Sequence, residues 1–157
     1  MNNMIIFIGA DHRGFPLKNA LKTWLADRNI PTTDVGAETL DPQDDYPVYA
    51  QKVAQNIASN WGVGREDSRG IVICGSGVGV DIVANKFAGV RCGLGINVDQ
   101  VIAARRDDHI NVLALAADST DDAQAKEMTK AFLETDYEDA ERRSRRLEEI
   151  KKIEEQS

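Results

Sequence analysis

The stretch Gly70-Ile71-Val72-Ile73-Cys74-Gly75-Ser76-Gly77-Val78-Gly79-Val80-Asp81 has the form of a buried strand that enters a glycine-rich turn and then a helix. Its apolar run shows no alternation, which is typical of a strand covered on both faces. Glycines in the turn allow left-handed backbone conformations and bring successive N–H groups close to a bound oxygen atom. The turn alone is consistent with a phosphate cradle, an enolate cradle or a plain turn.

The glycine turn fits neither of two common nucleotide-binding motifs. No Gly-Lys-Ser/Thr follows it, and the interval between Gly77 and Gly79 is shorter than the dinucleotide fingerprint requires. Cys74, at the junction of strand and turn, is either a small buried hydrophobe or a thiolate that removes a proton beside an oxyanion pocket. A helix that starts near Gly79 would direct its positive end at such a pocket.

Strand and helix patterns alternate on both sides of this stretch. Apolar runs predict strands at 4–10, 31–35, 70–74, 90–95 and 112–116. Helical periodicity predicts helices at about 16–29, 47–60, 79–87, 97–106 and from a Thr120 cap to beyond Phe132. The pattern predicts an α/β fold, a Rossmann-like doubly wound sheet of about five parallel strands with helices on both faces. Ligands of such sheets bind at the carboxyl ends of the strands.

Length and composition narrow the class of protein. The 157 residues are expected to form a single domain, 1–157, in which about 137–157 is a C-terminal helical extension. A net charge of −7 argues against nonspecific nucleic-acid binding, and no apolar segment is long enough to cross a membrane. The start of the chain shows no secretory signal, and two cysteines in apolar strands fit a reducing cytoplasm.

Other polar residues lie at positions where they would meet the glycine turn. Asp11 and His12 follow the first strand and would share its edge of the sheet; alternatively Asp11 caps the first helix and His12 is a surface residue. Tyr46 opens the second helix, where it faces the crevice or packs. Arg142 and Arg146 are one helical turn apart and would together grip a phosphate, or they pair with neighbouring glutamates on an exposed helix.

Several short motifs in fixed order make the chain resemble the family of ribose-5-phosphate isomerase type B and the galactose-6-phosphate isomerases. The motifs are Gly9-Ala10-Asp11-His12-Arg13-Gly14-Phe15, Asp45-Tyr46-Pro47, Cys74-Gly75-Ser76-Gly77-Val78-Gly79, Ala84-Asn85-Lys86-Phe87-Ala88-Gly89-Val90-Arg91 and Asn111-Val112-Leu113. The likeness extends from about residue 4 to 150. It implies aldose-ketose isomerisation through a cis-enediolate, a site between two subunits of a homodimer or dimer of dimers, and no metal or cofactor.

The same resemblance implies a role for individual residues. Cys74 would move a proton between C1 and C2, and Ser76 would assist proton transfer at the oxygens. Asp11 and Asp107 complete the expected catalytic set. The expected substrate-binding residues are His12, Tyr46, Gly75, Gly77, Val78, Gly79, Asp108, Arg142 and Arg146. Among these, His12 and the two arginines would hold the phosphate, and the loop backbone would hold the enediolate oxygen.

The chain departs from the family pattern at three places. Asp107-Asp108 stands where the family has His-Asn, with His109 displaced by two; Asp118 replaces a basic residue; Arg142-Arg143 replaces Arg-His.

The default substrate is ribose 5-phosphate, with Asp107 or His109 opening the sugar ring. A tetrose 4-phosphate, which cannot close a furanose ring, would need no such group. The residues are also compatible with galactose 6-phosphate as the substrate, with a two-chain isomerase and with a noncatalytic sugar-phosphate binding module.

Overall fold

Five parallel strands form one sheet in the order β2-β1-β3-β5-β4. The strands are β1 (Ile5–Ala10), β2 (Thr32–Asp34), β3 (Ser68–Cys74), β4 (Cys92–Leu94) and β5 (Val112–Ala116). The structure is a computed structural model that describes residues 3–157. The predicted doubly wound parallel sheet is therefore confirmed.

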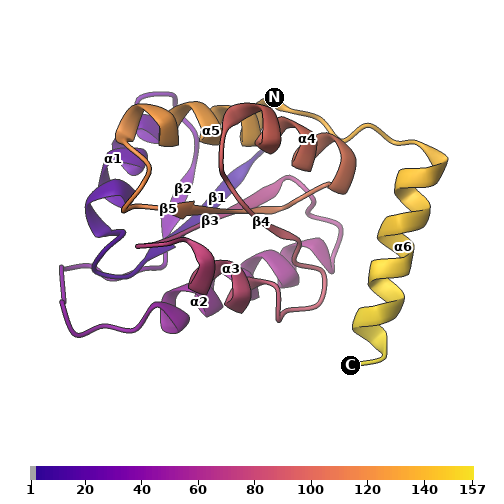
Figure 1. Ribbon diagram of the computed structural model, residues 1–157, viewed down its shortest axis with the longest axis horizontal. Helices are drawn as coiled ribbons and strands as arrows, with labels where there is room; N and C mark the ends of the chain where they lie inside the picture. Colours follow the sequence, from indigo (N-terminus) through magenta and orange to yellow (C-terminus); the bar gives the residue numbers. More distant parts are fainter. Residues whose placement is uncertain (1–2) are drawn as a thin grey trace.

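Helices cover both faces of the sheet, and a sixth helix stands beside it (Figure 1). They are α1 (Phe15–Ala26), α2 (Tyr46–Trp61), α3 (Val78–Ala84), α4 (Val98–Asp108), α5 (Asp122–Glu134) and α6 (Glu141–Glu155). Helices α1, α4 and α5 lie on one face and α2 and α3 on the other, so the sheet separates two apolar cores. Among residues 3–157, no helix combines the length and the apolar character needed to cross a bilayer.

Strand β3 is buried along its whole length and supplies both cores. Because side chains alternate along a strand, Ile71 and Ile73 pack under α1 and α5, whereas Val72 and Cys74 face α2 and α3. This alternation aims Cys74 at the side of the sheet on which the helix after the glycine turn begins.

The order of the strands creates a crevice at the carboxyl ends of two neighbouring strands. From β1 the chain moves outward to β2 and then returns to β3 on the opposite side of β1. Neighbouring crossovers therefore leave in opposite directions between β1 and β3, which is where open α/β sheets bind ligands. Ala10 pairs with Ile73 in this register, so Asp11 and Cys74 lie beside each other at the carboxyl edge.

Several predicted boundaries were wrong by a few residues. Helix α1 ends at Ala26, and Asn29 lies beyond it in a left-handed conformation. The cap of α5 is Asp121 in a capping box with Gln124, not Thr120, because the carboxylate accepts the Gln124 N–H. Helix α4 is capped by Asn97, whose side chain accepts the Gln100 N–H.

The predicted limits of β3 and β4 were also displaced. Strand β4 covers only 92–94 of the predicted 90–95, and β3 begins at Ser68, two residues earlier than predicted. The strand was predicted to begin after Arg69, because a charged residue argues against a buried strand. The guanidinium group of Arg69 is buried and donates to the carbonyl oxygens of Glu66 and Ser68.

Candidate active site

The glycine turn after β3 has no room for a side chain at Gly77 or Gly79. Gly77 has a φ of 73° and caps α3, and a Cβ there would lie 2.6 Å from Leu94 Cδ1. A Cβ on Gly79 would lie 2.6 Å from Tyr46 Cζ, so the first turn of α3 packs directly against the tyrosine ring. The turn thus brings its backbone close to residues from α2 and β4, as the glycine spacing predicts.

The predicted residues of the first strand and the glycine turn meet at one pocket of about 310 Å³. The pocket is lined by Asp11, Arg13, Tyr46, Cys74, Gly75, Ser76, Val78, Gly79 and Ile82. Cys74 is 3% exposed and nevertheless forms part of the wall. The residue is therefore enclosed by protein on most sides and contributes to the wall of the cavity.

Asp11 does not cap α1, since the N-cap is Gly14 and no side chain bonds to the start of the helix, but it holds the turn in front of the helix. It lies in the pocket wall, is 5% exposed, and its Oδ1 accepts the N–H groups of Arg13 (3.1 Å) and Gly14 (3.0 Å). Its carboxylate therefore holds the turn between β1 and α1 and leaves Oδ2 for other partners.

His12 is oriented by Asp44, a carboxylate that none of the sequence motifs contains. Asp44 Oδ1 lies 2.8 Å from His12 Nδ1 and accepts the His12 backbone N–H at 2.9 Å. Because an ionised carboxylate only accepts, Nδ1 carries the proton and Nε2 is the free nitrogen. An acidic pair directly before Tyr46 was the only signal of this contact in the sequence.

Within residues 3–157, Asp11, His12 and Asp44 form the group that could hold a metal ion, since their ligand atoms lie within 4.8 Å of one another. Asp44 Oδ1 already engages His12, and Asp11 Oδ1 accepts the backbone N–H groups of Arg13 and Gly14. These contacts account for the positions of the two carboxylates and the imidazole.

Asp107 and Asp108 lie at the opposite edge of the sheet. They end α4, and the chain then enters β5 at Val112, so both precede the strand whose carboxyl end adjoins the pocket. Five residues of β5 span roughly 17 Å at about 3.3 Å per residue. Within one chain, Asp107 therefore does not join Cys74.

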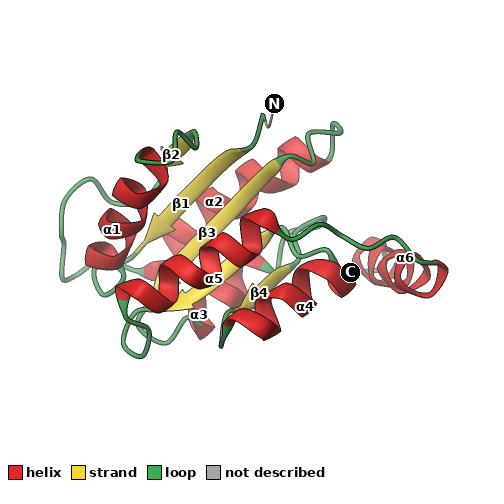
Figure 2. Ribbon diagram, turned by 90° about the horizontal axis from the view of Figure 1, so that it is seen from above, coloured by secondary structure: helices red, strands yellow, loops and turns green. Residues whose placement is uncertain are grey.

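Arg142 and Arg146 belong to this second edge as well. They lie on α6, and in Figure 2 the strands point away from the side on which α6 stands. Both arginines are exposed, and neither forms an ion pair with residues 3–157. The predicted site residues are thus split into two groups by the length of the sheet.

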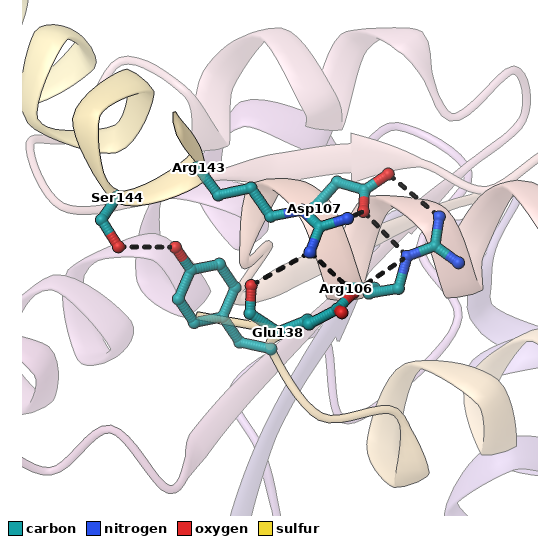
Figure 3. A network of polar contacts seen from close by, with 6 residues as sticks. Arg106, Asp107, Glu138, Arg143 and Ser144 are labelled. Atoms are coloured by element: carbon teal, nitrogen blue, oxygen red, sulfur yellow. Dashed lines mark hydrogen bonds and ion pairs between the residues drawn. The ribbon is translucent and has the colours of Figure 1, made fainter. Parts of the chain in front are cut away.

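A polar network anchors α6 to the end of α4 (Figure 3). Asp107 Oδ1 lies 2.8 Å from Arg106 Nε and 2.9 Å from Arg143 Nη2, and Arg143 Nη1 lies 2.6 Å from Glu138 Oε2. The hydrogen bond from Arg106, helped by its charge and that of Arg143, holds the pKa of Asp107 below its ordinary value. Asp107 is therefore ionised and engaged with cations at neutral pH.

His109 is packed into an aromatic group. Its ring stacks on Tyr137 with centroids 4.4 Å apart and meets the Trp61 ring edge-on at 5.0 Å. Burial lowers the pKa of His109 to about 4, and the nearby cations Arg105 and Arg91 act in the same direction. The imidazole is therefore neutral at physiological pH, and it lies at the α6 end of the molecule.

Comparisons with known proteins agree with this architecture. A sequence model of the family described as Ribose/Galactose Isomerase matches residues 6–150. The chain is 34% identical to the probable ribose-5-phosphate isomerase B of Mycoplasma genitalium over 97% of both proteins. It is 37% identical to ribose-5-phosphate isomerase B of Escherichia coli over 95% of both.

A solved structure is similar over its whole length. The crystal structure of the Mycoplasma genitalium enzyme with bound ribulose 5-phosphate superposes with a TM-score of 0.93 at 32% identity, covering 100% of each chain. Fold, sequence motifs and pocket residues thus agree with one another, and the chain belongs to the ribose/galactose isomerase family.

Proposed function

We propose that this chain interconverts ribose 5-phosphate and ribulose 5-phosphate through a cis-enediolate. The observation that carries the proposal is the single pocket in which Cys74 lies next to the glycine turn and Asp11. Relatives over nearly the whole chain are named ribose-5-phosphate isomerase B, which makes this pair the default substrate and product.

The proposed chemistry begins with removal of a proton from carbon. The Cys74 thiolate takes the proton from C2 of the open-chain aldose, and the electron pair left on carbon moves into the carbonyl, which places negative charge on O1. The N–H groups of the turn from Gly75 to Gly79 stabilise this oxyanion, which lowers the largest part of the barrier. The thiol then returns its proton to C1.

A second proton transfer takes place between the oxygens. The proton of the hydroxyl on C2 must leave as O2 becomes the ketone, and O1 must gain one. Ser76 is exposed at the pocket, and its Oγ accepts the Val78 N–H at 3.3 Å, so its own proton is free to be donated. Oxidation at C2 and reduction at C1 balance within the sugar, so the reaction needs no external electron acceptor.

The second half of the site, with part of its phosphate-binding set, comes from another copy of the chain. Arg142 and Arg146 are exposed and have no ion pair among residues 3–157, whereas the Cys74 pocket lies at the other edge of the sheet. In a two-fold dimer, each subunit would present α6 and Asp108 to its partner's pocket. His12 would then hold the phosphate together with the two arginines.

Subunit mixing tests this arrangement. A Cys74→Ala protein and an Arg142→Ala, Arg146→Ala protein are each expected to be nearly inactive. After co-expression or joint refolding, mixed dimers contain one intact site, so about a quarter of the parent activity should return. Mixtures that stay as inactive as the separate proteins would contradict a shared site.

The two cysteines of the chain give a matched test of the catalytic base. Cys74→Ala should abolish isomerisation, whereas Cys92→Ala should retain it, because Cys92 lies in β4 outside the pocket. Burial and the neighbouring Asp81 raise the pKa of Cys92 well above its ordinary value, which keeps this thiol protonated. Activity of Cys74→Ala within a few fold of the parent would show that another group is the base.

A panel of phosphorylated sugars identifies the substrate and distinguishes an enzyme from a protein that only binds a sugar phosphate. Phosphorylated tetroses, pentoses and hexoses are incubated with the chain alone in deuterated water, and deuterium at C1 or C2 is measured. Preference for ribose 5-phosphate supports the proposal, and preference for a tetrose 4-phosphate would point to an enzyme without ring opening. Binding with neither turnover nor label would indicate a noncatalytic module or a missing second type of chain.

A further inference from the structure

Arg13 is the one cationic side chain among the described residues that line the Cys74 pocket. It lies in the turn between β1 and α1, and its backbone N–H donates to Asp11 Oδ1 at 3.1 Å. This bond fixes the main chain from which the long side chain extends. The side chain itself is 55% exposed, so it borders the cavity and solvent together.

The guanidinium group of Arg13 lies directly against the first residue of the glycine turn. A Cβ on Gly75 would lie 2.5 Å from Arg13 Nε and 2.7 Å from Nη1. Any side chain at position 75 would therefore displace the arginine. Because Gly75 has no Cβ, the positively charged guanidinium group of Arg13 packs directly against the backbone that follows Cys74.

Asp118 holds the guanidinium group in this place from the far side. Its carboxylate pairs with Arg13 Nη2, and its backbone N–H donates to the Gly75 carbonyl oxygen at 3.0 Å. The segments that follow β1, β3 and β5 thus converge on Gly75. Since Asp118 engages Nη2, and Nε and Nη1 donate to no residue within 3–157, two donor atoms remain on the side of the turn.

We infer that Arg13 contacts the substrate and places its positive charge beside the oxyanion that forms at the glycine turn. This inference rests on the proposed isomerase function and adds a residue to it. The negative charge on the enediolate oxygen develops only as the proton leaves carbon, so a fixed cation beside it stabilises the transition state more than the bound sugar. Asp118 is a positioning residue that orients the guanidinium group.

A purely structural ion pair is the competing explanation. Both partners are about half exposed, with side-chain exposures of 55% and 48%, and pairs of this kind contribute little to stability. The two explanations differ in what they expect from the two partners. Removal of either partner breaks a structural pair equally, whereas only removal of Arg13 takes the charge away from the oxyanion.

The experiment compares Arg13→Gln, Arg13→Lys and Asp118→Asn with the parent, using steady-state kinetics on ribose 5-phosphate. Arg13→Gln should lower kcat at least about tenfold while KM stays within about threefold. Arg13→Lys keeps the charge and should recover part of kcat. Asp118→Asn breaks the same pair but leaves the charge, so its kcat should lie between that of Arg13→Gln and that of the parent. Thermal unfolding confirms that each variant is folded.

The outcomes distinguish this inference from the function on which it rests. A parent protein that does not turn over ribose 5-phosphate or another sugar of the panel refutes the proposed function itself. An active parent with Arg13→Gln within about threefold of its kcat refutes only the role of Arg13. Equal losses in Arg13→Gln and Asp118→Asn would also overturn it, because they would identify the pair as structural.

Discussion

The low pKa of His109 makes the stability of this protein depend on pH in a defined direction. In the unfolded chain His109 titrates near its ordinary value of 6.5, and in the folded protein burial and neighbouring arginines lower its pKa to about 4. Between these values the unfolded chain binds a proton that the folded protein does not. The free energy of unfolding therefore falls as the pH falls from about 6.5 to about 4.

The size of this effect follows from the interval between the two pKa values. At about 1.36 kcal/mol for each pH unit, an interval of 6.5 to about 4 corresponds to at most about 3.4 kcal/mol. The ring is only half-buried and solvent screens the nearby charges, so we expect a loss of about 2 kcal/mol. The other histidine, His12, lies in a different environment beside Asp44.

His109→Asn is the matched variant for this experiment. His109 occupies a left-handed conformation with a φ of 51°, which asparagine tolerates well, so the backbone is retained while the titrating group is lost. Urea unfolding of both proteins, followed by tryptophan fluorescence at one protein concentration, gives the free energy of unfolding at pH 7.5 and pH 4.5. Carboxylates titrate in both proteins and cancel in the difference between them.

The expected result is a change with pH in the difference between the free energies of unfolding of the parent and of His109→Asn. The parent should be the more stable protein at pH 7.5, because it retains the stack of His109 on Tyr137. Its advantage should shrink by about 2 kcal/mol at pH 4.5, where the unfolded parent gains a proton. An advantage that stays constant within about 0.5 kcal/mol across this range would refute the assignment of a low pKa to His109.

Two further predictions concern the glycine turn and the histidine beside it. Gly77→Ala should lower the free energy of unfolding by about 2–4 kcal/mol, because it adds a clash with Leu94 to backbone strain, whereas Gly64→Ala has open space and should cost only about 1 kcal/mol in the same thermal or urea unfolding assay. Equal losses would contradict this. Asp44→Ala should raise KM for the phosphorylated sugar several fold by releasing His12, and Asp45→Ala, which removes an exposed carboxylate next to it, should not. A KM unchanged by Asp44→Ala would mean that His12 needs no orienting carboxylate.

The sheet could be predicted from the sequence, because a strand that is buried on both faces consists of a continuous run of apolar residues. The sequence also predicted the glycine turn, since close backbone approaches at Gly77 and Gly79 admit no side chain. The placement of Asp11 and Cys74 at one edge followed from the rule that parallel strands share their carboxyl ends. Each of these features is determined within a few residues of the chain or by a general rule of topology.

Only the tertiary structure revealed the pairs of charged groups. Arg13 and Asp118 are separated by 105 positions and His12 and Asp44 by 32, so no local pattern connects them. The family resemblance implied a site between two subunits that includes Asp107 and Cys74, and the structure shows that these residues lie at opposite ends of the sheet of one chain. Hydrophobic periodicity reports which side of an element is buried, whereas the partner of a polar side chain depends on how distant segments meet after the core has formed.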